Sequence, residues 1–514
     1  MDILKIKKKN EVFVTIDCAE SGTLQELCEF FTFFAPGYKW MPAYKNKFWD
    51  GKLRLFNLRD HTLYAGLVPY LKEFAEVRKC ELEFLDDNYY GRIDSEIFID
   101  QNQLNKFIED LNLYAHNKQI EVRDYQLDAV TQVLTHTRKL LLSPTASGKS
   151  LIIYILIRWY LSKLKEMPNE KVLIVVPTTS LVEQLFKDFQ DYSTNDQDNW
   201  NNDEKCHKIY SGKEKINIQQ EVIITTWQSI YQMPASWFEN FRMVIGDEAH
   251  NFKAKSLTSI MEKLRDCKYR IGTTGTLDGT QTHKLVLEGL FGPVYQVTTT
   301  KELIDSEALS QLDISILLLK YDDKYCQEMK KKTYQEEIDF LVSYIPRNKF
   351  IRNLALAQEG NTLILYNYVE KHGKPIYDMI QKKLSESARP SAARKLFFVS
   401  GDVETDERER IRSITEGEKD AIIVASMGTF STGINIRNLH NIIFASPSKS
   451  QIRVLQSIGR GLRKADNNQG TKVFDIADDL HWKSSRNYTL DHAGERIRIY
   501  SKEKFNYTIH EVNV

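Results

Sequence analysis

A chain of 514 residues with 42% hydrophobic and 27% charged residues is too long for one compact core and too apolar to be disordered. Its formal net charge is zero, so a polyanionic partner would have to be held by local basic patches. No apolar run approaches the roughly 18 residues that cross a bilayer, and the start lacks a secretory core, which indicates a cytoplasmic protein without a membrane partner. The six cysteines are scattered without a CxxC pair, which argues against a zinc site or a disulfide framework.

The first 112 residues predict a small α+β domain that is separate from the rest of the chain. VFVTID (12–17) and KLRLFN (52–57) are typical of strands. TLQELCEFFTFF (23–34) and YLKEFAEV (70–77) are typical of helices.

Segment 37–59 of this domain combines basic and aromatic residues, and six basic residues against Asp50 give it a net charge of +5. Basic side chains contact phosphates and aromatic rings stack on exposed bases, so the segment predicts DNA binding. In the alternative interpretation, the rings form the core of a small domain and the lysines are a solvated surface. The predicted DNA contacts are Lys39, Lys45, Lys47, Trp49, Lys52 and Arg54.

From about residue 120, short apolar strands alternate with turns and amphipathic stretches, as in parallel sheets with helices on their faces. The first set of predicted strands is 139–143, 171–177, 221–227, 241–248 and 269–275, and the second is 361–367, 395–401, 420–426, 441–447 and 472–478. We therefore expect two tandem α/β domains, 113–300 and 301–480, with a charged helical segment at 322–357. A basic helical tail is expected at 481–514, and the polar run 193–205 is expected to be a surface loop.

The stretch SPTASGKS (143–150) lies between two apolar runs, where a strand would end and a helix would begin. Gly148 would let the backbone approach a nucleotide, Lys149 would reach its β and γ phosphates, and the Ser150 hydroxyl would coordinate Mg²⁺. The common phosphate-loop pattern GxxxxGK(S/T) has glycine where this chain has Ser143. On its own the stretch is therefore compatible with a structural turn as well.

A second stretch, FRMVIGDEAH (241–250), would deliver two carboxylates to the carboxyl edge of the same sheet. Asp247 is placed to hold Mg²⁺, and Glu248 is placed to orient the attacking water. Alone, such an acidic pair is more often a helix N-cap. Together with the loop it predicts ATP hydrolysis, because that reaction needs both a phosphate cradle and a metal carboxylate.

In QSIGRGLR (456–463), Arg460 and Arg463 are three residues apart, so on a helix both would project to one side. If that side faces the first α/β domain, the two guanidinium groups meet the γ phosphate only when the domains close. Hydrolysis would then be coupled to a conformational step.

Taken together, these segments resemble the superfamily 2 DEAH-box DNA helicases over nearly 350 residues. RDYQLDAV (123–130) resembles the segment whose glutamine reads adenine, PTASGKS resembles motif I and DEAH motif II. VVPTTSLVEQ, TTWQSI and GTTGTL resemble motifs Ia, Ib and III, and LILYNYVEKHG, ASMGTFSTGINI and QSIGRGLR resemble motifs IV, V and VI. Motif I is commonly PTGSGKT in the family, so Ala146 and Ser150 depart from it here.

The resemblance implies two RecA-like parallel-sheet domains that use ATP and Mg²⁺. It implies catalytic roles for Lys149, Asp247, Glu248, His250, Arg460 and Arg463, with Ser150 and Asp247 as metal ligands. It implies nucleotide contacts by Arg123, Gln126, Pro144, Thr145, Ala146, Ser147, Gly148, Lys149, Ser150, Gly433 and Gln456. Contacts with the DNA backbone are implied for Thr178, Ser180, Thr226, Gln228 and Thr429.

The exact motif sequences, together with FGPVYQVTTTKELID (291–305) and the terminal NYTLDHAGERIRIYSKEKFNY (487–507), resemble the branch of the superfamily that acts on branched DNA. Within that branch they most resemble the recombination helicases of T-even bacteriophages. This resemblance implies a monomer in the host cytoplasm that remodels forks, Holliday junctions and R-loops in recombination, repair and replication. Its partners would be DNA, RNA–DNA hybrids and single-strand-binding or recombination proteins. Two alternatives stay open: an RNA helicase, and a non-unwinding double-stranded DNA translocase subunit of a larger complex.

Overall fold

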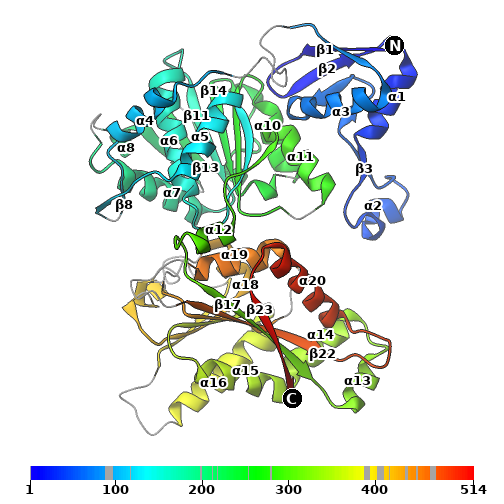
Figure 1. The fold of residues 1–514 in the computed structure, drawn as a ribbon, viewed down its shortest axis with the longest axis vertical. Helices are drawn as coiled ribbons and strands as arrows, with labels where there is room; N and C mark the ends of the chain where they lie inside the picture. The colour runs from blue at the N-terminus through cyan, green and yellow to red at the C-terminus, as the bar shows by residue number, and fades with distance from the viewer. Residues whose placement is uncertain are drawn as a thin grey trace. The chain divides into compact units, whose positions relative to one another are not determined.

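The computed structural model describes residues 2–514 except 87–96, 116, 197–199, 211, 217, 253, 278–279, 387–393, 402–409, 412, 416, 434–437, 447–449 and 463–469. The chain divides into two compact units (Figure 1), Met1–Ser143 with Gly148–Val297 and Pro144–Ser147 with Thr298–Val514. Among the described residues, no helix combines the length and the apolar character that crossing a bilayer requires.

The first unit begins with a small α+β domain, as the sequence predicts. Its five-stranded sheet has the order β5-β6-β2-β1-β7 and is covered by two helices. The elements are β1 (Ile3–Lys8), β2 (Phe13–Asp17), α1 (Ser21–Phe30), β5 (Phe56–Asn57), β6 (Thr62–Tyr64), η2 (Ala65–Leu67), α3 (Val68–Arg78) and β7 (Glu81–Phe84). Alternate residues of β1 and β2, among them Leu4, Ile6 and Val14, are buried, so one face of the sheet meets the helices.

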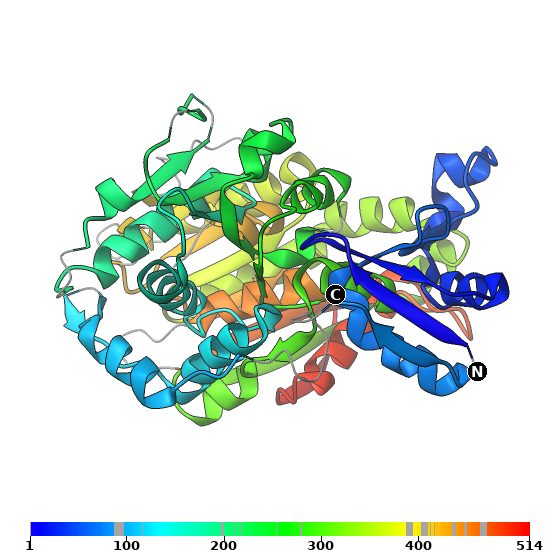
Figure 2. The same ribbon diagram turned by 90° about the horizontal axis from the view of Figure 1, so that it is seen from above.

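A small appendage extends away from this sheet (Figures 1 and 2), and we call residues 32–54 the basic–aromatic module. Its elements are the antiparallel pair β3 (Thr32–Phe34) and β4 (Lys52–Arg54), the short η1 (Tyr38–Trp40) and α2 (Pro42–Lys45). Gly51 has a left-handed φ of 80°, and a Cβ there would collide with the Tyr38 ring. Glycine is therefore required where the chain returns to β4.

The rest of the first unit is built on a seven-stranded sheet with parallel neighbours in the order β12-β13-β11-β14-β15-β10-β16. The strands are β10 (Arg138–Leu142), β11 (Lys171–Val176), β12 (Cys206–Ile209), β13 (Val222–Thr226), β14 (Phe241–Asp247), β15 (Tyr269–Thr274) and β16 (Val294–Gln296). Both faces are covered, which explains the nearly continuous Val, Ile and Leu runs of the central strands.

Helices on one face are α4 (Gln101–Asp110), α5 (Asp124–His136), α6 (Lys149–Trp159), which continues into a turn at Tyr160–Leu164, and α7 (Thr179–Tyr192). On the other face are α9 (Trp227–Ile230), α10 (Lys255–Lys263) and α11 (Gln281–Phe291). Shorter elements are β8 (Tyr114–Ala115), β9 (Lys118–Gln119), α8 (Asn202–Lys205), η5 (Ala235–Phe238) and η6 (Ala249–Asn251).

The structure differs from two expectations in this unit. Helix α4 was expected in the N-terminal domain 1–112, but Leu104 and Phe107 on its apolar face are buried in the same core as α5 and α6. The boundary therefore lies before residue 97. The polar run 193–205 was expected to be a surface loop, but it contains α8 and the buried Asn202, whose Nδ2 donates to the carbonyl of Phe186.

The second unit holds another seven-stranded sheet with parallel neighbours, in the order β19-β20-β18-β21-β22-β17-β23. Its strands are β17 (Leu312–Lys320), β18 (Thr362–Tyr366), β19 (Leu396–Val399), β20 (Ile422–Ser426), β21 (Asn441–Phe444), β22 (Thr471–Asp479) and β23 (Tyr507–Asn513). Helices are α12 (Thr300–Asp305), α13 (Asp323–Met329), α14 (Tyr334–Ser343), α15 (Ile345–Ala357), α16 (Lys374–Ser385), preceded by a turn at Val369–Gly373, α18 (Met427–Gly433), α19 (Gln451–Gly461) and α20 (Tyr488–Lys502). The predicted helical segment 322–357 is confirmed as α13 to α15.

The expected basic tail, 481–514, is instead an integral part of the second unit (Figure 1). Strand β23 pairs with β17 and forms the edge of the sheet, with Ile314 opposite Tyr507. Arg496 of α20 is buried and forms an ion pair with Asp475 of β22, and the Tyr500 hydroxyl donates to the same carboxylate at 2.9 Å. Part of the positive charge of this segment is thus neutralised inside the fold.

Candidate active site

The loop 143–148 joins the end of β10 to the first residue of α6, as the sequence predicts for a phosphate cradle. The Ser143 N–H donates to the carbonyl of Thr274 at 2.8 Å, and the Ser147 hydroxyl donates to the carbonyl of Pro144 at 2.7 Å. Lys149 Nζ donates to the Ser143 carbonyl at 3.3 Å. The loop is therefore a closed turn, and the free N–H groups of a helix N-terminus follow it, an arrangement that binds anions.

Gly148 is the residue at which this loop cannot carry a side chain. It has a left-handed φ of 83°, and a Cβ there would collide with Nε2 of Gln126. Gln126 is buried, and its Oε1 accepts a hydrogen bond from the Arg123 N–H at 3.0 Å at the start of α5. The structure thus places the predicted adenine-reading carboxamide against the predicted phosphate loop. The Arg123 guanidinium takes no part in the contact between Gln126 and Gly148. It donates to the Tyr125 hydroxyl at 3.0 Å.

Ala146 occupies the position at which the family commonly has glycine, and its φ is 67°. A residue with a Cβ is disfavoured in this left-handed region by about 1–2 kcal/mol. The loop therefore stores strain at the position where this sequence departs from the common form of motif I.

Strand β14 ends at the buried Asp247, whose Oδ1 accepts a hydrogen bond from Thr273 Oγ1 at 2.6 Å. Burial raises the pKa of Asp247, the Glu248 carboxylate raises it further, and the charge of Lys149 opposes both. The lysine of the loop and the acid of the strand therefore act on each other electrostatically.

These groups fit a divalent cation that is bound together with a nucleotide. Among the described residues, no cluster of three or more His, Cys, Asp or Glu side chains could hold a metal by itself. Mg²⁺ is commonly held by one or two carboxylates together with substrate phosphates, and Asp247 beside the phosphate loop matches that pattern. An ionised Asp247, costly in a buried site, would be stabilised by such a charge.

Glu248 has a left-handed φ of 52°, and its Oε2 lies 3.4 Å from His250 Nδ1. The same imidazole nitrogen lies 3.0 Å from Thr274 Oγ1, and His283 Nε2 lies 3.0 Å from the His250 carbonyl oxygen. The end of β14 is thus connected through His250 to the end of β15. Thr273 and Thr274 were not predicted as site residues, although GTTGTL after an apolar strand was the available signal.

Ser150 Oγ lies 2.8 Å from the hydroxyl of Tyr192 at the end of α7. A hydroxyl can donate its proton to one neighbour while its lone pairs remain for a cation, so this contact is compatible with the predicted metal role. Tyr192 is 42 positions from Ser150 and carried no sequence signal.

Four predicted DNA contacts follow β11 and β13 at the edge of the sheet that also carries the phosphate loop, because the strands are parallel. Thr178 Oγ1 lies 3.0 Å from Ser180 Oγ, and Gln228 Nε2 donates to the carbonyl of Pro177 at 3.4 Å, which joins the two segments. Thr226 Oγ1 lies 2.9 Å from Ser229 Oγ. The four side chains make these local contacts, and their roles toward DNA stay predictions.

The predicted residues of the second unit are described less fully. Thr429 accepts a hydrogen bond from Ser426 Oγ at 2.6 Å at the start of α18, and Gly433 is the last residue of that helix. Gln456 and Arg460 belong to α19, whereas Arg463 lies outside the described residues. Their nucleotide roles stay predictions.

In the basic–aromatic module, the DNA contact of Trp49 stays a prediction. This ring is half-buried, and its Nε1 donates to the Lys52 carbonyl at 2.9 Å. Arg54 forms an ion pair with Asp50. The most exposed rings of the module are Trp40 and Phe48, which lie in segment 37–59 but were not among the predicted contacts.

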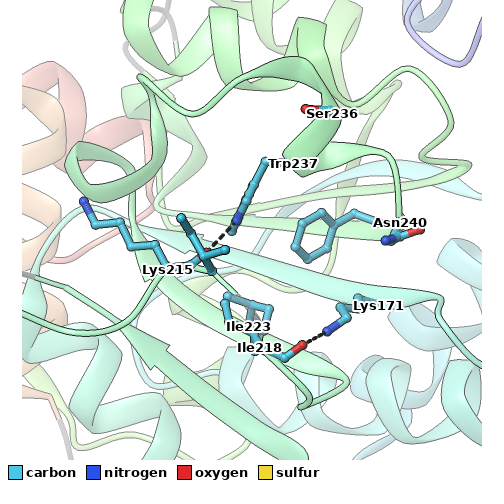
Figure 3. Close-up of a pocket in the computed structure, with 9 residues that line it drawn as sticks. Lys171, Lys215, Ile218, Ile223, Ser236, Trp237 and Asn240 are labelled. Atoms are coloured by element: carbon cyan, nitrogen blue, oxygen red, sulfur yellow. Dashed lines mark hydrogen bonds between the residues drawn. The ribbon is translucent and has the colours of Figure 1, made fainter.

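A cavity of about 230 Å³ in the first unit (Figure 3) lies away from this site. It is lined by Lys171 and Phe241, the first residues of β11 and β14, and by Trp237, whose Nε1 donates to the Lys215 carbonyl at 2.8 Å. The amino ends of parallel strands lie at the edge opposite the phosphate loop. This cavity is therefore not the nucleotide site.

Two parallel sheets, a phosphate loop and an acidic strand end that is hydrogen-bonded to Thr273 of the neighbouring strand define a motor ATPase of the helicase class. Family models match as the res subunit of type III restriction enzymes at residues 119–279, the N-terminal domain of DNA helicase UvsW at residues 2–84 and the helicase conserved C-terminal domain at residues 346–465. The ATP-dependent DNA helicase uvsW of enterobacteria phage T4 is 35% identical over the full length of both chains. The chain belongs to the UvsW family of DNA helicases.

Other similarities agree with this assignment. The crystal structure of T4 UvsW matches at 34% identity over the whole of both chains, with a TM-score of 0.52. The DNA 3'-5' translocase XPB2 of Sulfurisphaera tokodaii is 24% identical, over 84% of this chain and 91% of the relative. The type ISP restriction-modification enzyme LlaBIII bound to DNA matches 86% of this chain and 34% of its own at 16% identity and a TM-score of 0.57, which shows a shared fold alone.

Proposed function

We propose that this chain couples ATP hydrolysis to the unwinding and remodelling of branched DNA, including forks, Holliday junctions and R-loops. The observation that carries the proposal is the convergence of Lys149 and Asp247 at the sheet edge that also carries the hydroxyls after β11 and β13. A phosphate cradle and a strand-binding surface on one edge are what a nucleic-acid motor needs. Membership of the UvsW family supports DNA as the track.

In this mechanism, the N–H groups at the start of α6 and the Lys149 ammonium bind the β and γ phosphates. Gln126 and Arg123 bind the adenine side of the nucleotide. Ser150 and Asp247 would hold Mg²⁺, and the ion would neutralise phosphate charge when bound. Glu248 orients the attacking water and accepts its proton, and His250 positions Glu248 through Nδ1 while Thr274 holds the imidazole.

The second unit contributes the step that couples hydrolysis to movement. Arg460 and Arg463 stabilise the charge that develops on the γ phosphate, as arginine fingers do. Such fingers change turnover by about 10³–10⁵-fold, so hydrolysis depends strongly on their approach. The hydroxyl and amide groups of Thr178, Thr226 and Gln228 contact the DNA backbone without regard to sequence.

The expected setting is the host-cell cytoplasm, where the chain acts as a monomer on forked DNA, junctions and RNA–DNA hybrids. Single-strand-binding and recombination proteins are its expected partners. A second candidate is a double-stranded DNA translocase that does not separate strands, which the match to the res subunit of type III restriction enzymes favours.

The test compares ATPase stimulation by single-stranded DNA, forked DNA, four-way junctions, R-loops and duplex RNA, and it measures strand displacement on the same substrates. The proposal expects the strongest stimulation and displacement with branched DNA. Stimulation by duplex DNA without displacement would support the translocase, and a preference for duplex RNA would overturn DNA as the track. Lys149→Ala is the control: it should lose hydrolysis by about 100-fold or more and keep its DNA affinity, because the lysine contacts phosphates of the nucleotide.

A further inference from the structure

Trp40 and Phe48 are the most exposed aromatic residues of the basic–aromatic module. The exposed fraction is 79% for Trp40 and 86% for Phe48. Exposing such rings forfeits the burial that usually stabilises aromatic side chains. The two residues therefore need an explanation other than packing.

The backbone fixes both rings in their outward positions. Trp40 ends the η1 turn, which begins after Gly37 with φ 70°. Lys47 adopts a left-handed φ of 59° after α2, and the next N–H, that of Phe48, donates to the Ala43 carbonyl at 2.9 Å. Phe48 thus follows directly on the turn that closes α2, and its side chain is exposed there.

Other rings of the module contact one another. Phe34 and Tyr38 are stacked with centroids 4.6 Å apart, and Tyr44 meets Tyr38 edge-on at 4.8 Å. Trp49 is fixed by its bond to the Lys52 carbonyl. Because these contacts hold the module together, Trp40 and Phe48 are available for a partner.

Positive charge surrounds the exposed rings. Residues 32–54 contain five basic residues and one acid, Asp50, and therefore have a net charge of +4. The ion pair with Arg54 occupies that acid. Lys39, Lys45 and Lys47 are exposed, and Lys45 Nζ lies 5.4 Å from the centre of the Trp40 ring.

We propose that Trp40 and Phe48 form a stacking surface for unpaired bases at a DNA branch, with Lys39, Lys45 and Lys47 on the flanking phosphates. The proposal rests on the proposed action on branched DNA and names the feature that this module recognises. Stacking needs a base face, which an uninterrupted duplex hides and a branch exposes. A protein partner fits less well, because charged residues, and lysine in particular, are depleted in the centres of protein interfaces.

The test uses the full-length double variant Trp40→Ala/Phe48→Ala without nucleotide, so that the motor does not cycle. Two probes carry 2-aminopurine beside the branch of a fork, either unpaired or paired, and a third is an uninterrupted duplex. Affinity for the unpaired fork should fall about tenfold for each ring removed, whereas affinity for the duplex should change less than about twofold. The quenching of unpaired 2-aminopurine seen with the parent protein should disappear. Trp40→Phe/Phe48→Tyr should restore both, since rings are retained.

Phe98→Ala is the matched control, because this ring is 89% exposed but lies outside the module. It should behave as the parent protein does. If the double variant keeps the parent's preference for unpaired bases, the proposal is wrong. It is also wrong if the double variant changes only the oligomeric state, since the rings would then contact a second copy of the chain. ATPase stimulation by single-stranded DNA, measured in parallel, separates this result from a failure of the motor proposal, which would remove stimulation from the parent protein as well.

Discussion

Asp247 illustrates how a residue that suits catalysis can oppose stability. Its carboxyl is buried at the end of β14, and burial together with the Glu248 charge raises its pKa. The folded protein therefore binds the Asp247 proton more tightly than the unfolded chain does. For a carboxyl with a raised pKa, stability declines as the pH rises from the ordinary value near 3.8 through the raised value.

Replacing Asp247 by Asn mimics the protonated form and keeps an oxygen that can accept the bond from Thr273. At pH 7–8 the nucleotide-free variant should melt at a higher temperature than the parent, and this difference should vanish at pH values below the ordinary pKa of Asp. ATPase activity should fall by about 100-fold or more, because a metal carboxylate contributes several kcal/mol to the transition state. Thermal melts across pH and steady-state hydrolysis measure the two effects.

Asp50→Asn is the control of opposite sign, because the hydrogen bond from Arg54 lowers the pKa of Asp50 to about 2. That substitution should not raise the melting temperature at any pH. Equal melting temperatures for Asp247→Asn and the parent at pH 8 would contradict the role of burial at Asp247.

The strain at Ala146 leads to a second prediction at the same scale. Ala146→Gly removes the Cβ from a left-handed position and should stabilise the folded protein by about 0.5–1 kcal/mol, the cost of the strain less the entropy that glycine adds to the unfolded chain. Chemical denaturation of the nucleotide-free protein measures the change. Ala129→Gly within α5 is the control and should destabilise by about 1 kcal/mol or more, since glycine weakens a helix interior. A loss of stability in both variants would show that Ala146 is not strained.

At the scale of elements, most of the strands predicted from the sequence are ones that the fold buries. Strands such as β11 and β13 are buried on both faces, so they are continuous runs of Val and Ile. Strand β12 has the mixed sequence CHKI, and β16 has only three residues. The edge strand β23 is mostly exposed and polar. These three were not predicted, because no local pattern distinguishes such strands from loops. The largely buried β17, LDISILLLK, was also not predicted, although its apolar run was an available signal.

The candidate site was predictable to a similar extent. Motif spacing placed Lys149 at the start of a helix after β10 and Asp247 at the end of β14, as the structure has them. The charge of Lys149 also opposes the rise in the pKa of Asp247, an interaction that the spacing did not predict. The bond between Ser150 and Tyr192 depends on how α6 and α7 pack, which spacing does not specify. Trp49 and Phe48 are adjacent in sequence, and only the turn at Lys47 decides which ring is exposed.

A third prediction concerns the contact between the N-terminal domain and α11. The Tyr70 hydroxyl donates to Glu288 at 2.6 Å, and the N-terminal core includes Leu285 of the same helix. Gly66 packs so closely that a Cβ would collide with the Glu288 carbonyl. The Glu288 carbonyl also accepts the hydrogen bond from the Gly292 N–H that ends α11. A side chain at position 66 would therefore push the N-terminal domain away from the end of α11.

Gly66→Ala should therefore loosen this contact while leaving the phosphate loop intact. We expect faster hydrogen exchange in α3 and α11, ATPase stimulation by single-stranded DNA within about twofold of the parent, and junction remodelling that is about tenfold slower. Gly22→Ala is the matched control, because a Cβ at Gly22 has no neighbour within 4 Å. If both variants show the parent's hydrogen exchange and the parent's rate of junction remodelling, the contact between Gly66 and α11 does not hold the N-terminal domain in place for remodelling.

At the scale of the whole molecule, the hydrophobic core of the first parallel sheet begins earlier in the chain than the predicted boundary at residue 112. Helix α4 follows the N-terminal domain but fills the core of the first parallel sheet with Leu104 and Phe107. The Ile97 N–H donates to the Thr135 carbonyl at 2.9 Å, so the motor begins no later than this residue. The nucleotide motifs all lie beyond it.

Two truncations test whether this boundary separates an autonomous motor from a domain that confers branch recognition. Deleting residues 1–96, with Leu285→Gln to cover the surface that the N-terminal domain leaves, should give a folded protein whose ATPase still responds to single-stranded DNA. It should remodel junctions at least about tenfold more slowly than the full chain, because the stacking and phosphate contacts of the module are lost. Deleting residues 1–112 should also remove α4 and lower the melting temperature by several degrees, as the loss of buried Leu and Phe side chains requires. Equal melting temperatures for the two truncations would place α4 outside the motor core, and full junction activity in the shorter deletion would assign branch recognition to the motor domains themselves.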